Sequence, residues 1–186
     1  MYLCFVKLFL IVTKYIIGCC GNFNTYNNMN TYSAEYTNMD KYFRSPVRFT
    51  KVVNEQREVS YQPISSTPTS TGCKFMDMVF EAINNGTVSE KQLATKLGLN
   101  TMKCLHTVET LTGYTVRKLA LRRKMFLVYQ LMQYSSMTLT QVARYCNLSS
   151  VSFMCRAFRR TYNKTPYRVR LRAKREGTIG AYLLDI

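Results

Sequence analysis

Acidic residues are scarce in this chain, and one long stretch has none at all. Of 186 residues, 10 are Asp or Glu against 26 Lys or Arg, which gives a formal net charge of +16. Between Thr110 and Arg175 there are 15 basic residues and no acidic one, whereas residues 1–73 carry 7 basic and 4 acidic side chains. Such a stretch repels itself in the folded state unless a polyanion neutralises it. The charge therefore predicts nucleic acid as the main partner, with an anionic membrane surface as the alternative.

The sequence also lacks the motifs of common enzyme and metal sites. It contains no glycine-rich phosphate loop, no HExxH and no GxSxG, and its acid-free half offers no pair of carboxylates for acid–base catalysis. The seven cysteines form no CxxC pair, and the single histidine has no second histidine at zinc-site spacing. We expect no catalytic activity, no metal and no cofactor, and reduced thiols that mostly fill the core.

The first twenty residues are strongly apolar but contain no uninterrupted run that could span a membrane. Lys7 and Lys14 break the run, which falls short of the roughly 18 residues that a span requires. Lys14 lies inside the apolar segment, whereas a signal peptide has its charge ahead of it. Three interpretations of residues 1–28 stay open: a membrane anchor within residues 2–20, an apolar helix or strand that packs on the body, or an extension upstream of a protein that begins at Met29.

Residues 29–73 are expected to be a loop and linker region. Asn, Thr and Tyr dominate residues 21–40, and residues 63–72 combine two prolines with many hydroxyl side chains, a composition typical of linkers. A short apolar–polar alternation from Val47 to Val53 is compatible with a strand or with no regular structure.

From Lys74 onward, apolar residues recur with the period of helices. One face of a first helix carries Phe75, Met78, Val79, Ala82 and Ile83. Two short helices follow: Ser89 can cap the first, which ends at Gly98, and Asn100 can cap the second, which ends before Gly113. Two helices joined by a short turn that contains glycine are typical of a helix-turn-helix.

A second unit of the same design follows one long helix. Residues 115–133 are compatible with a helix whose buried stripe is Leu121, Met125, Val128 and Met132. A short helix from Thr138, a turn at Asn147-Leu148 and a helix capped by Ser149 or Ser150, with Met154 and Phe158 inward, complete the unit. The connecting helix is roughly 28 Å long, close to the roughly 34 Å of one DNA turn. Two recognition helices held this far apart can enter successive major grooves.

The stretch from Phe75 to Arg170 resembles the DNA-binding domain of the AraC/XylS-type transcriptional regulators. The second unit carries the most specific matches: Leu139 to Ala143, Cys146 to Ser149, Ser152 to Arg160, Tyr162 to Pro166, and Val169-Arg170. The first unit adds Leu93-Ala94, Leu97 to Leu99 and Leu111 to Gly113. Thr165 can cap a final helix whose first turn tolerates Pro166.

Pattern and resemblance together predict an all-α fold. We expect two helix-turn-helix subdomains joined by a long linker helix and preceded by a poorly structured N-terminal region. The DNA-binding domain is placed at residues 74–175, with its parts at 87–113 (first helix-turn-helix), 115–133 (linker helix), 138–162 (second helix-turn-helix) and 166–174 (final helix), before a tail at 176–186.

The resemblance, mapped by position, implies which side chains meet DNA. Against base edges it places Val151, Ser152 and Arg156 of the second recognition helix, and Met102, Leu105 and His106 of the first. Arg156 is favoured because a guanidinium can donate two hydrogen bonds to guanine O6 and N7. Phosphate contacts are expected from Lys103, Arg144, Arg159 and Arg160. As alternatives, Met102 and Leu105 are packing residues, and Arg156 is a solvated surface charge.

Four positions depart from the family's pattern. His106 and Lys124 stand where Arg is frequent, and Asn147 and Asn163 stand where Gly is frequent. Asn tolerates the left-handed conformation that such turns need. The histidine puts base recognition by the first unit in question, so that unit is alternatively a clamp on the DNA backbone.

We therefore predict a bacterial, sequence-specific DNA-binding transcription regulator with double-stranded DNA as its partner. The resemblance implies recruitment of RNA polymerase and activation, while repression by occlusion is equally compatible with the residues. Residues 1–73 are too few for the sensor domain of most family members, so we expect a stand-alone activator without a small-molecule effector, in the cytoplasm at the nucleoid. A membrane-tethered basic protein and a DNA binder without sequence preference are the alternatives.

Overall fold

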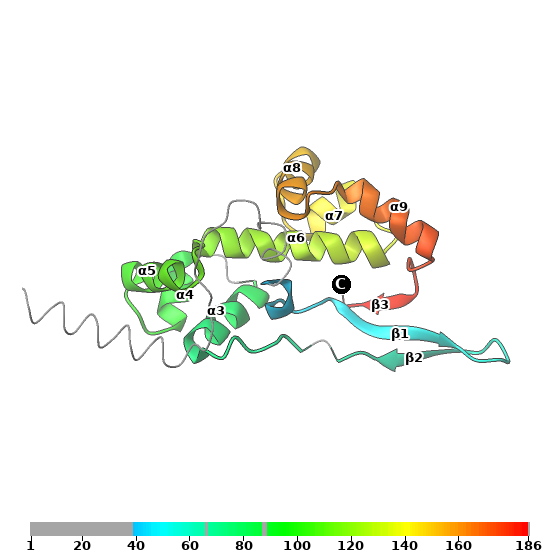
Figure 1. Ribbon diagram of the computed structural model, residues 1–186, viewed down its shortest axis with the longest axis horizontal. Coiled ribbons are helices and arrows are strands. Elements are labelled where there is room, and N and C mark those ends of the chain that lie inside the picture. The colour runs from blue at the N-terminus through cyan, green and yellow to red at the C-terminus, as the bar shows by residue number, and fades with distance from the viewer. Residues whose placement is uncertain (1–38, 66, 87–88, 186) are drawn as a thin grey trace, which may run out of the picture. The chain divides into compact units, whose positions relative to one another are not determined.

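The computed structural model describes residues 39–65, 67–86 and 89–185, and the three interpretations of residues 1–28 concern residues outside these ranges. The described residues form a short 3-10 helix, seven α-helices and a small sheet (Figure 1). The helices are η1 (Met39–Tyr42), α3 (Lys74–Asn84), α4 (Glu90–Lys96), α5 (Thr101–Thr112), α6 (Val116–Tyr134), α7 (Leu139–Tyr145), α8 (Val151–Tyr162) and α9 (Pro166–Glu176). Among these helices, none has both the length and the apolar character to cross a membrane.

The expectation of a mostly helical fold is confirmed, but a purely α-helical one is wrong. Three antiparallel strands form a sheet in the order β2-β1-β3, with β1 at Val47–Val53, β2 at Val59–Pro63 and β3 at Tyr182–Leu184. The alternation from Val47 to Val53 is thus a strand, and its partners come from the expected linker and the expected tail. Periodicity within one segment carries no information on a partner that lies more than a hundred residues away, so the pairing of β1 with β3 could not be predicted.

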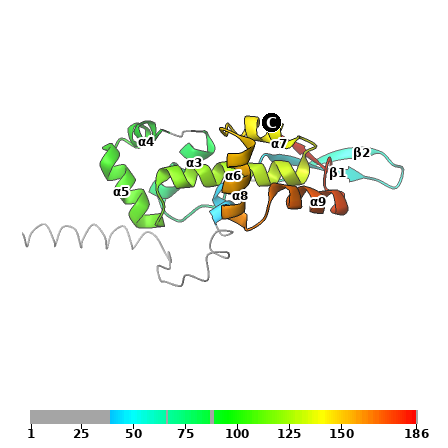
Figure 2. The ribbon, with the colours of Figure 1, turned by 90° about the horizontal axis from the view of Figure 1, so that it is seen from above.

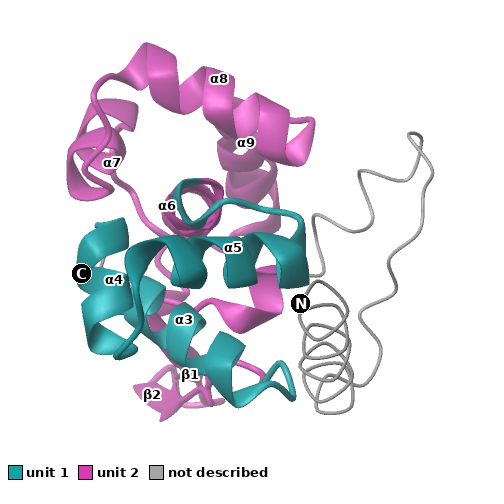
Figure 3. Cartoon of the chain, turned by 90° about the vertical axis from the view of Figure 1, so that its left-hand side faces the viewer, with its two compact units in different colours: residues 1–28, 70–117 teal, residues 29–69, 118–186 magenta. Residues whose placement is uncertain are grey.

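The chain divides into two compact units (Figure 3), and each contains one pair of helices with a short turn between them. Unit 1 contains Ser70–Arg117 with α3, α4 and α5. Unit 2 contains Lys118–Ile186 with α7, α8 and α9, together with the described part of Met29–Thr69. Helix α6 begins in the last residues of unit 1 and continues in unit 2.

The buried face of α3 differs from the predicted one. Met76 and Phe80 are buried in the structure, together with the predicted Val79, Ala82 and Ile83. Met78, expected inside, is exposed. Residues 75–83 are apolar on nearly all sides of the helix, with only Asp77 and Glu81 polar, so helical periodicity could not select one face.

A carboxylate near the start of α3 binds the preceding segment. Thr71 donates its backbone N–H and its hydroxyl to Asp77 Oδ1, each at 2.7 Å, and the Ser70 hydroxyl donates to Oδ2 at 2.6 Å. Desolvation by itself would raise the pKa of Asp77, but these hydrogen bonds outweigh it and lower the pKa. A negative charge near a helix N-terminus is also stabilised by the helix dipole.

The core of unit 2 joins α6 to the three helices that follow it. Its fully or almost fully buried members are Met125, Val128, Leu131, Met132, Val142, Ala143, Cys146, Met154, Ala157, Phe158 and Val169. Three of the four residues in the predicted α6 stripe belong to it, and Leu121 is half-buried. Figures 1 and 2 show α8 crossing over α6 above this core. Burial raises the pKa of the Cys146 thiol to about 12, so this cysteine is protonated and acts as a small packing residue, as predicted.

A buried ion pair attaches η1 to the helices of unit 2. Arg122 of α6 donates to Asp40 Oδ1 from Nη2 at 2.9 Å and from Nε at 3.0 Å, and the Tyr162 hydroxyl of α8 donates to Oδ2 at 3.1 Å. Burial raises the pKa of Asp40, while Arg122 and Tyr162 act in the opposite direction. Arg122 also donates to the Thr161 carbonyl at 3.4 Å. The segment that precedes the sheet is therefore fixed to α6 and to the last turn of α8.

We expect Asp40→Ala to lower the free energy of unfolding by about 3 kcal/mol, because it leaves the Arg122 guanidinium buried without its carboxylate. Urea denaturation measures the loss. Asp185→Ala is the control, since it removes an exposed ion pair with Arg48 and should cost less than about 1 kcal/mol. Equal losses in the two variants would show that the buried pair has no special role.

Candidate nucleic-acid interface

Helices α7 and α8 of unit 2 form the predicted second helix-turn-helix. The Thr138 hydroxyl accepts the Gln141 N–H at 3.3 Å and Gln141 Oε1 accepts the Thr138 N–H at 2.8 Å, a reciprocal pair at the start of α7. Ser150, one of the two predicted caps, accepts the Phe153 N–H at 3.1 Å at the start of α8. Asn147 between the helices has φ of 48°. This Asn takes the left-handed conformation, as predicted.

The end of α8 and the start of α9 also have the predicted capping residues. Asn163 follows its last turn with φ of 53°, as predicted for an Asn that stands where Gly is frequent. Thr165 then accepts the Arg168 N–H at 3.3 Å and Pro166 begins α9, so the predicted cap of the final helix is confirmed.

Two cations of neighbouring helices hold the ends of α7. Lys124 of α6 donates to the Asn147 carbonyl at 2.7 Å, in the turn between α7 and α8. Arg170 of α9 donates to the carbonyls of Ser135 at 2.6 Å and Met137 at 2.8 Å, in the segment between α6 and α7. Both side chains belong to the acid-free stretch, whose excess positive charge is predicted to bind a polyanion. Their positions show instead that they fix the helix-turn-helix.

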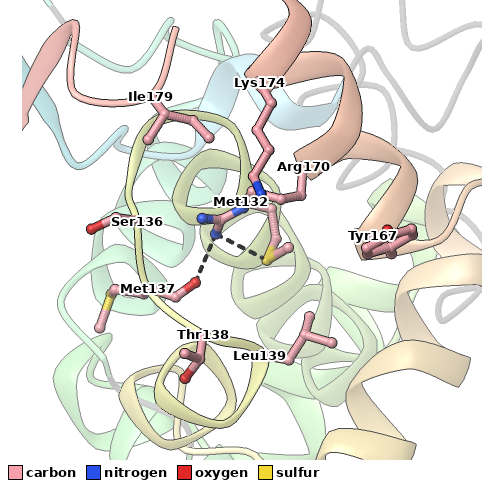
Figure 4. A pocket seen from close by; sticks show the side chains of 9 residues that line it. All are labelled: Met132, Ser136, Met137, Thr138, Leu139, Tyr167, Arg170, Lys174 and Ile179. Carbon is pink, nitrogen blue, oxygen red and sulfur yellow. Dashed lines mark hydrogen bonds between the residues drawn. The ribbon is translucent and has the colours of Figure 1, made fainter. Parts of the chain in front are cut away.

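An open cavity of about 400 Å³ lies beside Arg170. Figure 4 shows the guanidinium against its wall, bound to the Met137 carbonyl and near the Met132 sulfur, with Tyr167 and Leu139 on another side. Burial lowers the pKa of Arg170. Because both Nη groups are directed at main-chain carbonyls, Arg170 serves the α6–α7 connection and is not aimed at an external anion.

The exposed face of α8 carries most of the predicted contacts of the second unit. Ser152, Arg156, Arg159 and Arg160 are all exposed, and Val151 is half-buried against the core. Arg144, expected at a phosphate, is exposed on α7. Phe153 is also exposed and lies next to Ser152, but an isolated aromatic residue gave no signal in the sequence. Helix α8 therefore presents three arginines and no acidic side chain.

Helices α4 and α5 of unit 1 form the first helix-turn-helix within the described residues. Gly98 in the turn has φ of 64°, and Asn100 accepts the Met102 N–H at 2.9 Å, as predicted. Ser89 precedes α4, but its side chain makes no cap hydrogen bond, so that part of the prediction is wrong. Residues 87 and 88, where the first helix-turn-helix was expected to begin, lie outside the described ranges.

The exposed face of α5 is less basic than that of α8. Met102 is 75% exposed, which contradicts the packing alternative for this side chain, whereas Leu105 is half-buried. Lys103 and His106 are exposed, and His106 Nδ1 lies 3.2 Å from the Thr110 hydroxyl. One lysine and the exposed Glu109 are the only charged residues of α5. Any polyanion is therefore attracted more strongly by α8 than by α5.

Known proteins share this arrangement of helices. The model of a helix-turn-helix domain family matches residues 93–172. Over these residues, which are less than half of the chain, the sequence is similar to that helix-turn-helix family. A transcriptional regulator with an AraC-type DNA-binding domain from Chromobacterium violaceum has a similar fold, with a TM-score of 0.50 and 22% identity over 54% of this chain and 91% of that one.

Two further solved structures have a similar fold. A DNA-binding transcriptional dual regulator from Escherichia coli K-12 has a TM-score of 0.50 and 21% identity, over 54% of this chain and 93% of that one. A probable AraC family transcriptional regulator from Rhodopseudomonas palustris CGA009 has a TM-score of 0.50 and 19% identity, over 53% of this chain and 96% of that one. The curated proteins contain no match. At these identities the likeness establishes the fold of the AraC-type domain.

We expect Thr138→Ala to destabilise the helix-turn-helix domain by about 1 kcal/mol, because it removes the reciprocal cap of α7. Ser89→Ala is the matched control: it changes the residue that precedes α4, where no side-chain cap exists, and should change stability by less than about 0.5 kcal/mol. Thermal unfolding followed by circular dichroism compares the two. A larger loss from Ser89→Ala would contradict the assigned caps.

Proposed function

We propose that the chain is a sequence-specific DNA-binding transcription regulator and that α8 is its principal recognition helix. The observation that supports this most directly is the exposed face of α8, where Ser152 lies near the start, Arg156 in the middle, and Arg159 and Arg160 near the end. A helix fits the major groove, and the N-terminal residues of a recognition helix contact base edges.

The side chains of α8 divide by chemistry into two groups. Arg156 can donate two hydrogen bonds to a guanine, Ser152 can bind either a base or a phosphate, and Val151 can contact a thymine methyl. Arg159 and Arg160, together with Arg144 of α7, are assigned to phosphates, which position the protein without reading the sequence. Arg122, Lys124 and Arg170 are omitted from this interface because their bonds are internal.

For unit 1 we propose a second, weaker contact with DNA through α5. Met102 and His106 lie one helical turn apart and are both exposed, so they can contact the same groove. Leu105 offers a partly buried apolar surface and Lys103 a phosphate contact. The single lysine and the nearby Glu109 limit electrostatic attraction. In this proposal the two units occupy successive major grooves, with α5 contributing less affinity than α8.

We further propose an activating role with recruitment of RNA polymerase, which rests on the resemblance to AraC-type regulators. Expression of the chain beside a reporter promoter that carries its binding site separates activation from repression by occlusion. Independence from a small-molecule effector remains a prediction.

We expect Arg156→Ala to weaken binding to a duplex enriched from a random pool by about 10- to 100-fold, with little effect on unrelated DNA. Arg160→Ala should weaken binding to both duplexes alike and reduce the salt dependence by about one counterion. Arg175→Ala, an exposed arginine in the last turn of α9, is the charge-matched control and should change affinity by less than about threefold. Fluorescence anisotropy at several salt concentrations measures the DNA affinity of all three variants.

If Arg156→Ala weakened binding to the enriched and the unrelated duplex equally, Arg156 would be a phosphate contact. If the unaltered chain bound both duplexes equally at about 150 mM salt, it would be a DNA binder without sequence preference.

A further inference from the structure

Among the described residues, the outer edge of strand β2 in unit 2 has no neighbouring strand, because β1 lies between β2 and β3 (Figure 1). All five residues of β2 are exposed. Asn54 donates its N–H to the Glu58 carbonyl at 3.1 Å, and Ile64 donates its N–H to the Arg48 carbonyl at 2.7 Å. In the antiparallel register these bonds direct the main chain of Ser60 and Gln62 toward β1. The N–H groups of Val59 and Tyr61 and the carbonyl of Pro63 therefore point outward.

This edge lacks the features by which proteins protect exposed strands. The β2 sequence, Val-Ser-Tyr-Gln-Pro, contains no charged residue, and only Pro63 at its end restricts pairing. The opposite edge is different, since β3 has three residues and its pairing with β1 is irregular between Val47 and Phe49. The described sheet thus offers a single edge suited to a further strand.

The charge of the sheet favours a second copy of the chain over an anionic partner. The strands and the β1–β2 turn carry three basic residues, Arg48, Lys51 and Arg57, and two acidic ones, Glu55 and Glu58. Asp185, which directly follows β3 and pairs with Arg48, brings the sum to zero. The whole chain carries +16, so two copies repel each other over most of their surface. A neutral face is where two such copies can approach.

From these observations we propose that β2 pairs antiparallel with β2 of a second copy, with Tyr61 on the two-fold axis. In this register each Tyr61 N–H donates to the other Tyr61 carbonyl, and each Val59 N–H donates to the other Pro63 carbonyl. Both outward donors of each strand are then satisfied, while the Val59 carbonyl, which lies opposite Pro63 and its missing N–H, accepts hydrogen bonds from water only. Because the described sheet of each copy offers one edge suited to pairing, the assembly closes as a dimer.

Pairing by the edge fits the sheet better than stacking by its face. Phe49, Val53, Val59, Tyr61 and Leu183 lie on one face and are 39–55% exposed. Lys51 stands on the same face between Phe49 and Val53, so stacked sheets would bury a lysine from each copy. Edge pairing leaves Lys51 in water. It also buries less than the roughly 800 Å² per partner of a stable interface, so we expect a dissociation constant above about 1 μM.

Sedimentation of the full chain from about 1 to about 100 μM tests the proposal. The unaltered chain should shift from monomer toward dimer. Tyr61→Lys places like charges opposite each other on the axis and should raise the dissociation constant at least about tenfold. Val53→Lys is the matched control, because it puts the same charge on the same face of β1, away from the edge, and should dimerise as the unaltered chain does.

A cysteine at position 61 provides a second readout that does not depend on affinity. A hydrogen-bonded antiparallel pair has Cα atoms about 5.5 Å apart, within the range of a disulfide. Tyr61→Cys should therefore form a dimer linked at position 61 under mild oxidation, identified by mass spectrometry, and Val53→Cys should not. A monomer at about 100 μM without this cross-link would overturn the proposal. Association that survives Tyr61→Lys would also overturn it, as would association abolished by Val53→Lys. Neither the sedimentation nor the cross-linking result depends on whether the chain binds DNA.

Discussion

The burial of Phe158 determines which side of α8 faces solvent. This side chain is fully buried and lies against the rings of Tyr129 and Tyr162, with centroid distances of 6.1 and 4.9 Å. Met154 lies one turn earlier on the same face and is also buried. With that face fixed on α6 and α7, Ser152 and Arg156 are held on the opposite face. The position of the proposed DNA contacts is therefore a consequence of core packing.

The basic side chains of unit 2 fall into two groups, those that bind other parts of the unit and those that are exposed. Arg122 binds Asp40 and the end of α8, Lys124 binds the turn after α7, and Arg170 binds the segment before α7. These cations lie in the acid-free stretch, yet they hold the helix-turn-helix together from inside. The arginines of α8 and Arg144 of α7 remain exposed. A count of basic residues therefore overestimates the charge that is available to a polyanion.

Local chemistry made part of the structure predictable. Asn100, Thr138, Ser150 and Thr165 cap their helices as their side chains allow, and Asn147 adopts a positive φ. These features depend on neighbours within four residues. The buried face of α3 was less predictable, because an apolar residue lies on almost every side of that helix.

Features that join distant segments could not be found in the sequence. Asp40 meets Arg122 across 82 positions, and β1 pairs with β3 across more than a hundred. An isolated aspartate in a polar segment gives no sign of a buried partner. Of the candidate site, the sequence indicated side chains that the structure places on exposed faces of α5, α7 and α8, with Val151 and Leu105 half-buried. It did not indicate the cations that position those helices.

Selection of bound duplexes from a random pool at about 150 mM salt tests the central claim most directly, because this salt suppresses binding driven by counterion release alone. We expect an enriched sequence with two conserved parts about one helical turn apart. The part assigned to α8 should be the stronger, and it should disappear in selection with Arg156→Ala. Recovery of unenriched DNA would contradict sequence-specific recognition, and a single conserved part that survives Arg156→Ala would contradict the role assigned to α8.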